Sequence, residues 1–383
     1  MQIILKLTTA CNLNCSYCSE GDRAIERMPE DIFYKLVDEL PALLDHVGKR
    51  NAEFLFHGGE PLLYGRDGLK RLIDYARAQL STFDIQFLMQ TNGTLIDDDW
   101  IEFLKAQDIH VGISLDGYPD IHDQFRRTKD DRPTAALIVD NIKRLREAGL
   151  SVGTLMVLNS AVDADKLFDF IREHNLHPKI HPVIACGRAQ SRNDVDELYD
   201  VYTDVMKRLL ERSLELDDAD VIEPLDEIIN AILELEPIHE CAFNGSCGRE
   251  FICLYPDGEA GFCGRDNYAR HLSYGSLRDR SLVELYESAN AKKIRARQEY
   301  LRRHDCAGCS DWELCHGGCA FEAVNACGVL ESKYPNCLER KKFIEWLRTE
   351  GLKMLKAALV RAKTRRRKSL EIKKQLRSEI EDL

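Results

Sequence analysis

Strand–helix alternation in the first half of the chain is the feature that most limits its fold. Short apolar runs rich in β-branched residues alternate with amphipathic stretches from residue 3 to residue 184. Short runs of this kind predict buried strands, and the longer stretches have the apolar spacing of helices. We expect strands at residues 3–8, 53–57, 85–90, 111–115, 152–158 and 179–184, and helices at residues 29–47, 68–80, 97–107, 134–148 and 163–174.

Six strand–helix units predict an α/β fold with parallel strands, arranged as an open or closed barrel. In such folds the functional groups gather at the C-terminal ends of the strands. Every unusual motif in this half lies at the C-terminal end of a predicted strand. The motifs are the cysteines Cys11, Cys15 and Cys18, then Gly58-Gly59-Glu60-Pro61, Gln90-Thr91-Asn92-Gly93 and Ser114-Leu115-Asp116-Gly117.

The cysteine triplet indicates a metal centre that carries out chemistry. A structural zinc ion or a stable iron–sulfur cluster normally takes four protein ligands. Here three cysteines lie close together, and no nearby Cys or His completes the set. An iron–sulfur cube held by three thiolates keeps one iron open to a small molecule. The alternative interpretations are a zinc knuckle and three buried thiols.

Taken together, these motifs resemble the radical S-adenosylmethionine (SAM) superfamily, whose fold is a partial (β/α)6 barrel of the TIM type. The resemblance implies that Cys11, Cys15 and Cys18 bind a [4Fe–4S] cluster whose open iron chelates SAM. One electron would then cleave SAM to methionine and a 5′-deoxyadenosyl radical, which takes a hydrogen atom from the substrate. The protein would bind SAM, aim the radical and exclude water and oxygen.

The same resemblance assigns SAM contacts to residues at several strand ends. Two adjacent glycines let the backbone approach a ligand closely, and their motif is the one that contacts the SAM amino group in the family. Arg126 has Arg127 and Arg132 as rivals, and Gln90 and Ser114 have a structural role at a strand end as the alternative. The cofactor-binding candidates are Tyr17, Gly58, Gly59, Glu60, Gln90, Ser114 and Arg126.

A second group of cysteines begins at residue 241. Its spacing is Cys241-x5-Cys247, Gly258-x4-Cys263, Cys306-x2-Cys309-x5-Cys315-x3-Cys319, and finally Cys337. This order resembles the SPASM domain, which carries two auxiliary [4Fe–4S] clusters. The resemblance implies one cluster held by Cys241, Cys247, Cys263 and Cys319, and another held by Cys306, Cys309, Cys315 and Cys337. Three [4Fe–4S] clusters are therefore expected in all, with a pair of zinc sites as the alternative to the two auxiliary clusters.

Three cysteines remain outside these sets. Cys253 follows Cys247 at the same spacing as Cys247 follows Cys241, so it is a rival of Cys241 as a ligand as well as a candidate buried thiol. Cys327 is interpreted as a spacer residue. Cys186 ends the sixth predicted strand, near the expected substrate. It is interpreted either as a packed core residue or as a catalytic thiol.

The predicted organisation has four parts. They are a radical SAM partial barrel at residues 1–193, a helical linker at 194–238, a SPASM domain at 239–342 and a basic helical tail at 343–383. The basic end of the tail, residues 361–377, is interpreted as a solvated helix, with docking of an acidic leader peptide or partner as the alternative.

Composition and the termini limit the setting. The 383 residues include 14 cysteines and carry a net charge of −12, so nucleic acid is not an expected partner. The N-terminus lacks a signal-peptide pattern, and no apolar run is long enough for a membrane span. We therefore expect a cytoplasmic protein without a membrane partner, in which clustered cysteines bind metal and do not form disulfides.

Members with a SPASM domain mostly act on peptides or protein side chains. The sequence therefore predicts an oxidoreductase-type maturase of a ribosomally made precursor peptide, reduced by a flavodoxin or ferredoxin, which forms a thioether, ether or C–C crosslink. The alternatives are an anaerobic sulfatase-maturating enzyme, which forms formylglycine, a small-molecule radical SAM dehydrogenase, and a non-catalytic electron-transfer protein. Sulfatase maturases carry an Asp directly after the cysteine that corresponds to Cys263, whereas Gly264 follows here. Cys186 and Asp266 are the catalytic candidates, and the general base is unassigned.

Overall fold

The parallel sheet follows the predicted strand order. The computed structural model describes residues 1–216, 222–267 and 270–363. Each predicted strand is present, with its ends within two residues of the expected positions. The strands are β1 (Gln2–Thr8), β2 (Asn51–Gly58), β3 (Asp84–Thr91), β4 (Ile109–Ser114), β5 (Val152–Leu158) and β6 (Pro178–Pro182). Neighbouring strands pair in parallel from β1 to β6, which confirms the predicted α/β barrel.

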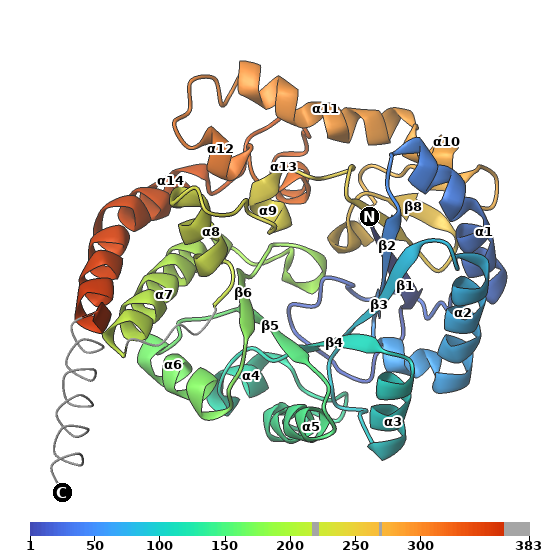
Figure 1. The fold of residues 1–383 in the computed structure, drawn as a ribbon, viewed down its shortest axis with the longest axis horizontal. Coiled ribbons are helices and arrows are strands. Elements are labelled where there is room, and N and C mark those ends of the chain that lie inside the picture. The colour runs from blue at the N-terminus through green and yellow to red at the C-terminus, as the bar shows by residue number, and fades with distance from the viewer. Residues whose placement is uncertain (217–221, 268–269, 364–383) are drawn as a thin grey trace, which may run out of the picture.

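Helices cover the outside of the curved sheet (Figure 1). The five predicted helices are α1 (Glu30–His46), α2 (Arg66–Gln79), α3 (Asp98–Ala106), α5 (Ala135–Glu147) and α6 (Ala164–Glu173). Asp97 and Asp163 begin α3 and α6 by accepting hydrogen bonds from backbone N–H groups three residues later. The additional α4 (Pro119–Phe125) was not predicted, because seven residues are too few to show a helical period.

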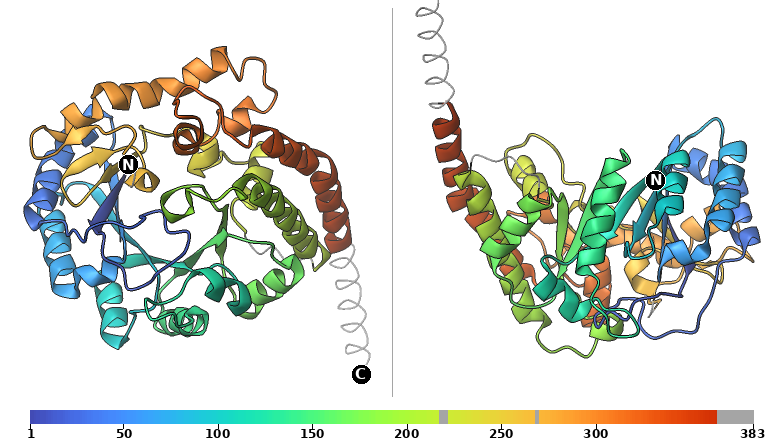
Figure 2. Two further views of the ribbon diagram at one scale, coloured as in Figure 1. Left: turned by 180° about the vertical axis from the view of Figure 1, so that it is seen from behind. Right: turned by 90° about the horizontal axis from the view of Figure 1, so that it is seen from below.

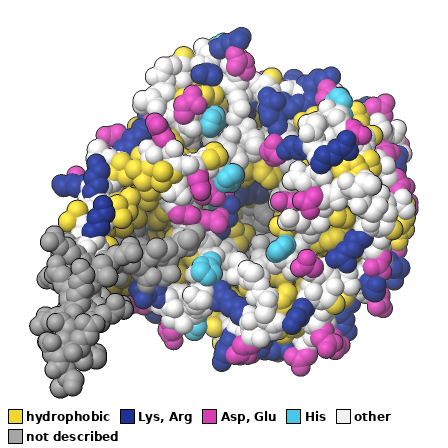
Figure 3. Space-filling view, viewed as in Figure 1, with side chains coloured by type: hydrophobic (Ala, Val, Ile, Leu, Met, Phe, Trp, Pro, Cys, Tyr) yellow, Lys and Arg dark blue, Asp and Glu magenta, His cyan; other side chains and the backbone are white. Residues whose placement is uncertain are grey.

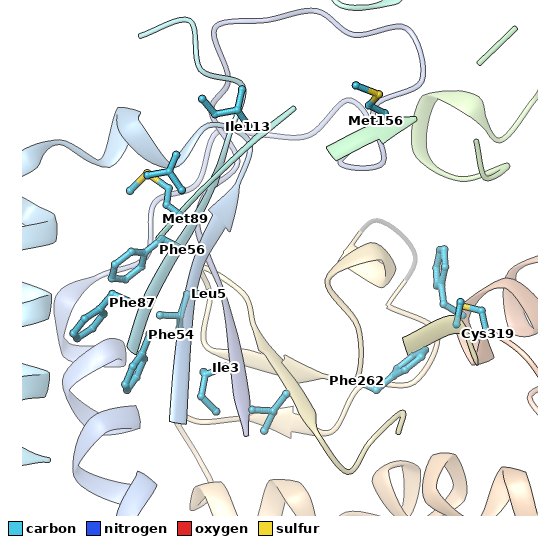
Figure 4. Packing of buried hydrophobic residues seen from close by; sticks show 14 of the residues in the cluster. Ile3, Leu5, Phe54, Phe56, Phe87, Met89, Ile113, Met156, Phe262 and Cys319 are labelled. Atoms are coloured by element: carbon cyan, nitrogen blue, oxygen red, sulfur yellow. The ribbon is translucent and has the colours of Figure 1, made fainter. Parts of the chain in front are cut away.

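The outer face of the sheet carries the apolar core. Phe54 and Phe56 on β2 stack with Phe87 on β3, at ring-centroid distances of 5.5 and 5.9 Å. Figure 4 shows that these rings point toward the helices on that side. Phe54 also packs against Phe33 of α1, at a ring-centroid distance of 5.9 Å. Because side chains alternate along a strand, residues such as Lys6 and His57 face the interior of the barrel instead.

The cysteine-rich region extends the barrel sheet. Strand β7 (Phe251–Leu254) pairs in parallel with β1, and β8 (Glu259–Gly261) and β9 (Gly275–Ser276) follow antiparallel. The nine-stranded order is therefore β6-β5-β4-β3-β2-β1-β7-β8-β9. This pairing was not predicted, because cysteine spacing carries no information about strand partners. It fixes the second group of cysteines against the first strand of the barrel.

Helices fill the rest of the chain. After the linker helices α7 (Val195–Glu215) and α8 (Leu225–Ile232), the cysteine-rich region contains further helices. They are α9 (Cys241–Asn244), α10 (Leu282–Tyr286), α11 (Ala289–Arg303), α12 (Trp312–Cys315), α13 (Ala320–Cys327) and α14 (Cys337–Trp346). A π-helical turn (Leu347–Gly351) continues α14 into helical residues 352–363, which run beside α7 (Figure 2).

The surface charges and the described helices bear on the predicted partners. Acidic and basic side chains are interspersed over the face shown in Figure 3. None of the described helices is long and apolar enough to cross a membrane. Most of the predicted basic end, from residue 364 onward, lies outside the described residues.

Candidate functional site

One cavity collects most of the predicted site residues. It measures about 220 Å³ and lies at the C-terminal ends of the barrel strands. The predicted residues that line it are Cys11, Cys15, Tyr17, Cys18, Gly58, Gly59, Gln90, Ser114, Arg126 and Cys186. A larger surface groove of about 780 Å³, between residues 231–238 and α12, contains none of the predicted site residues. The smaller cavity is therefore the candidate site.

Two glycines hold the triplet loop against β2. The N–H of Gly59 donates to the carbonyl of Thr8 at 2.7 Å, and that of Glu60 donates to the carbonyl of Ala10 at 2.8 Å. A Cβ atom on Gly58 would lie 2.3 Å from the Thr8 oxygen, and one on Gly59 would lie 2.3 Å from the Ala10 oxygen. Only glycine lets the end of β2 come this close to the carbonyls of Thr8 and Ala10. The glycine motif therefore positions the loop that carries the cysteines, in addition to its predicted contact with SAM.

A second loop holds the triplet from the opposite side. A Cβ atom on Gly187, whose φ is +55°, would lie 2.2 Å from the Cys18 carbonyl oxygen. The N–H of Arg188 donates to the same carbonyl at 3.0 Å, and its guanidinium donates to the carbonyl of Cys15 at 3.0 Å. Arg188 was not predicted, since an arginine after a glycine carries no recognisable spacing.

The three thiols are arranged for a cluster that replaces their protons. Burial raises the pKa of Cys11 to about 12 and that of Cys15 to about 11. The Cys11 sulfur accepts hydrogen bonds from the N–H of Leu13 at 3.4 Å and from the Asn92 amide at 3.8 Å. Buried thiols with raised pKa values lose their protons only to a strongly bound cation, because metal ligation requires thiolates. This donor set fits an iron–sulfur cluster open to the cavity.

A buried ion pair fixes Arg126 at the cavity. Its Nε donates to Asp116 Oδ2 at 2.8 Å, and the Tyr17 hydroxyl donates to the same oxygen at 2.5 Å. The Arg126 guanidinium also lies 5.1 Å from the centroid of the Tyr17 ring. Asp116, which is fully buried, therefore orients two predicted site residues, although the sequence analysis gave it no role.

Gln90 and Ser114 meet directly, whereas Glu60 lies elsewhere. Gln90 Nε2 donates to Ser114 Oγ at 3.0 Å, and both residues line the cavity. The fully buried Glu60 carboxylate accepts bonds from the Thr91 hydroxyl at 2.7 Å, the Asn92 N–H at 2.8 Å and the Leu62 N–H at 3.0 Å. Burial raises its pKa to about 7. Glu60 thus ties the second motif to the third and is absent from the cavity wall.

The four cysteines predicted for the outer auxiliary cluster share one small cavity. Cys306, Cys309, Cys315 and Cys337 line a space of about 20 Å³. A single zinc ion would hold four thiolates in a tight tetrahedron at about 2.3 Å. Among the described His, Cys, Asp and Glu residues, no three are close enough to hold one metal ion together. All four cysteines nevertheless line one space, as the ligands of a shared cluster must.

The cysteines of the other predicted set, Cys241, Cys247, Cys263 and Cys319, are close enough to affect one another electrostatically. Burial raises the pKa of Cys241 and of Cys319, and the thiols of Cys247 and Cys263 raise both further. Cys253, the rival ligand, is fully buried on β7, where Lys6, Cys263 and Glu20 act on its pKa. Cys327 is exposed at the end of α13.

The two catalytic candidates differ in position. Cys186 is 6% exposed and lines the cavity, and burial raises its pKa to about 12. Asp266 is 2% exposed and does not line it. Its carboxylate is 2.6 Å from Nδ1 of His271 and accepts the His271 N–H at 3.1 Å. Of the two, only Cys186 shares the cavity with the triplet.

Charged groups that the sequence analysis did not select also line the cavity. Glu20 lies 2.6 Å from Nζ of the buried Lys6, which in turn lies 3.2 Å from Nδ1 of His57. His181 and Arg265 complete this part of the wall. Position 264 faces the same lysine, because a Cβ atom on Gly264 would lie 3.6 Å from Lys6 Nζ. Nothing in the linear spacing marks these residues.

Two protein-family models match the chain. The radical SAM superfamily model matches residues 5–172, and the model of the SPASM iron–sulfur cluster-binding domain matches residues 241–310. The two matches coincide with the barrel and with the cysteine-rich extension of its sheet.

Similar proteins include enzymes of two kinds. The cysteine-type anaerobic sulfatase-maturating enzyme of Clostridium novyi is 26% identical over 83% of this chain and 87% of its own length. The Fe-coproporphyrin III synthase of Methanosarcina barkeri is 25% identical over 89% of this chain and 88% of its own length.

Solved structures share the fold. Native anSMEcpe with bound AdoMet superposes with a TM-score of 0.78 at 21% identity, covering 93% of this chain and 98% of the other. The same protein with AdoMet and the Kp18Cys peptide gives 0.77 at 20% identity, with the same coverage.

Proposed function

The chain belongs to the radical SAM superfamily and carries a SPASM domain, and on this premise we propose that it is a maturase that modifies a residue of a ribosomally made precursor peptide. The observation that carries the proposal is the 220 Å³ cavity, where the cysteine triplet, the two glycines, Gln90, Ser114 and Arg126 meet. A peptide substrate is also supported by the relatives, which include sulfatase-maturating enzymes and a structure with a bound peptide.

We assign the radical step to residues 1–193 and propose that Cys11, Cys15 and Cys18 hold its cluster. A cluster and SAM bound there would supply the radical chemistry that removes a hydrogen atom from the substrate. The chain's own residues have separate tasks. Gln90 and Ser114 present amide and hydroxyl groups for hydrogen bonds to SAM. Arg126, held by Asp116, presents a fixed positive charge.

We propose that residues 239–342 hold the two auxiliary clusters, with residues 194–238 as the linker and 343–383 as the tail. The inner set is Cys241, Cys247, Cys263 and Cys319, and the outer set is Cys306, Cys309, Cys315 and Cys337. The electrostatic coupling within the inner set supports Cys241 over Cys253. Each of the four outer cysteines is partly exposed, which suits reduction by a flavodoxin or ferredoxin.

Crosslink formation is the favoured reaction of this maturase. A thioether, ether or C–C crosslink removes two hydrogen atoms from the peptide. The absence of a carboxylate at position 264 and the pairing of Asp266 with His271 support this reaction over formylglycine formation.

Sulfatase maturation is the second candidate, and the specific observation in its favour is the similarity to sulfatase-maturating enzymes over 83% or more of this chain. One experiment separates the two reactions. The enzyme is co-expressed with the short peptide encoded beside it or, in parallel, with a sulfatase-derived peptide, and the products are examined by mass spectrometry. A loss of two hydrogen atoms without reaction toward a hydrazine reagent supports the crosslink. A hydrazine-reactive aldehyde on the sulfatase peptide would favour formylglycine formation instead.

A further inference from the structure

Arg265 differs from the other fully charged side chains that line the cavity. Arg126 is paired with Asp116 at 2.8 Å, and Glu20 is paired with Lys6 at 2.6 Å. Across residues 1–216, 222–267 and 270–363, the Arg265 guanidinium makes neither an ion pair nor a hydrogen bond. It nevertheless lines the main cavity and a smaller one of about 20 Å³ beside it. A half-buried cation thus faces the cavity without a bonded counter-charge.

The carboxylates near Arg265 either bond to other groups or do not line the main cavity. Asp266 is bonded to His271. Glu240 is 2.5 Å from Lys179 and accepts the N–H of Ala242 at the start of α9. Glu322 lines the small cavity but not the main one. Within the main cavity, Arg265 therefore has room for an anion that the described residues do not supply.

Arg265 carries a full positive charge, because a guanidinium keeps its proton in proteins. A guanidinium presents a planar fork of donors that matches a carboxylate in two parallel hydrogen bonds. Such a pair is strongest where water is excluded, as in this partly enclosed cavity.

The wall around Arg265 leads back to the triplet. His181 and Cys186, from the end of β6, line the same cavity. Burial lowers the pKa of His181 to about 4, so its ring is neutral and offers a hydrogen bond without a charge. Cys15, Cys18 and Cys186 line the same cavity as Arg265. A group bound at Arg265 thus shares one enclosed space with the cysteines.

We propose that Arg265 binds a carboxylate of the substrate beside the modified atom, so that the peptide residue that reacts is an aspartate, a glutamate or a free C-terminal residue. This inference rests on the proposed function. It gives the chain a selectivity that a carboxylate at position 264 would oppose, because like charges disfavour a bound anion.

The test uses two small deuterated probes of equal shape. Reduced holoenzyme saturated with SAM is incubated with fully deuterated propionate or with fully deuterated propionamide, its neutral counterpart. Deuterium in the 5′-deoxyadenosine product is measured per molecule formed. We expect at least tenfold more deuterium from propionate. In R265Q this preference should fall at least tenfold, and R265K should retain part of it, because an ammonium keeps the charge without the fork.

The control is R50Q, which removes one positive charge from an exposed ion pair with Asp45 and should keep the full preference. Propionate that gives no more deuterium than propionamide in the wild type overturns the proposal, whether both transfer some or none. An unchanged preference in R265Q does so as well. If R265Q fails to assemble its clusters, R265K provides the test. The preference for propionate should then fall at least threefold in R265K, and an unchanged preference in R265K would overturn the proposal.

SAM carries a carboxylate of its own, so its affinity is measured in parallel by equilibrium binding. A tenfold weaker SAM affinity in R265Q, with the propionate preference intact, would assign Arg265 to SAM and overturn the proposal. Formation of no 5′-deoxyadenosine at all, with or without a probe, would instead contradict the proposed function.

Discussion

Asp116 accepts the Tyr17 hydroxyl and the Arg126 guanidinium on the same carboxylate oxygen, at 2.5 and 2.8 Å. Its other oxygen accepts the N–H of Val157 at 3.0 Å. One fully buried carboxylate thus joins the triplet loop, β5 and the segment after α4. The positions of Tyr17 and Arg126 in the cavity depend on it.

Replacing Asp116 with Asn should therefore weaken SAM binding. The neutral amide leaves the Arg126 charge buried and unpaired, and breaking a buried pair from one side costs about 3–5 kcal/mol. We expect the unfolding free energy to fall by about 3 kcal/mol and the dissociation constant of SAM to rise by roughly tenfold, a change of about 1.4 kcal/mol. Equilibrium binding checks the second effect. The control is D120N, which breaks only an exposed pair with Lys166; equal SAM affinity in D116N and D120N would count against this role.

Substituting all three triplet cysteines with Ala should remove one cluster and leave two. Three cubes correspond to about twelve iron atoms per chain, so the variant should retain about eight and make no 5′-deoxyadenosine. Iron analysis together with product measurement checks both parts. C327A, at an exposed position, serves as the control and should keep all the iron. A wild-type content of about four iron atoms would contradict the assignment of the two auxiliary sets.

Gly59→Ala should disturb the triplet loop without touching a cysteine. The added methyl group would lie 2.3 Å from the carbonyl oxygen of Ala10 and 2.6 Å from that of Thr9, and neither backbone atom can move without shifting the loop. We expect loss of the first cluster, seen as about four fewer iron atoms. Gly153→Ala on β5 is the matched control, since no atom lies within 4 Å of its added carbon. Full iron content in G59A would show that the loop tolerates the shift.

The buried His122 should make stability depend on pH. Its Nδ1 accepts the N–H of Asp116 at 3.1 Å, and burial lowers its pKa to about 4 from an ordinary value of about 6.5. The unfolded chain then binds a proton between pH 4 and 6.5 that the folded chain does not. His122 therefore contributes its full stability above pH 6.5, and this contribution, about 3 kcal/mol, is lost as pH falls toward 4.

Anaerobic thermal unfolding between pH 5 and 7 checks this dependence. Relative to the wild type, H122Q should show a smaller fall in the unfolding midpoint over that range, because Gln has no proton to take up. H110Q, at an exposed position on β4, should keep the wild-type slope. A slope in H122Q equal to that of the wild type would contradict the linkage.

The barrel could be predicted from the sequence because its signals are local. Each of the six parallel strands and five of the six barrel helices has its own apolar period and its own residues that mark where it starts and ends. Helix α4 gives no such signal, since it is seven residues long. The pairing of β7 with β1 is a contact between residues about 250 positions apart, and no local pattern encodes it.

The candidate site could be predicted where residues stand in a motif that resembles a known family. The cysteine triplet, Gly58, Gly59, Gln90 and Ser114 do so, and the structure brings them together around one cavity. Glu60 belongs to the same motif as two cavity residues, but its carboxylate accepts three hydrogen bonds that hold it away from the cavity wall. Arg265 and Asp116 act through the positions that folding gives them, so their neighbours in sequence carry no sign of their roles.

Formation of 5′-deoxyadenosine tests the central claim most directly. The protein is reconstituted anaerobically with iron and sulfide, reduced with dithionite and mixed with SAM, and the products are separated by chromatography. The assignment of the cavity predicts 5′-deoxyadenosine and methionine from the wild-type protein and neither from the variant with three triplet alanines. No 5′-deoxyadenosine from wild-type protein that contains its full iron, or equal amounts from the triplet variant, would contradict it.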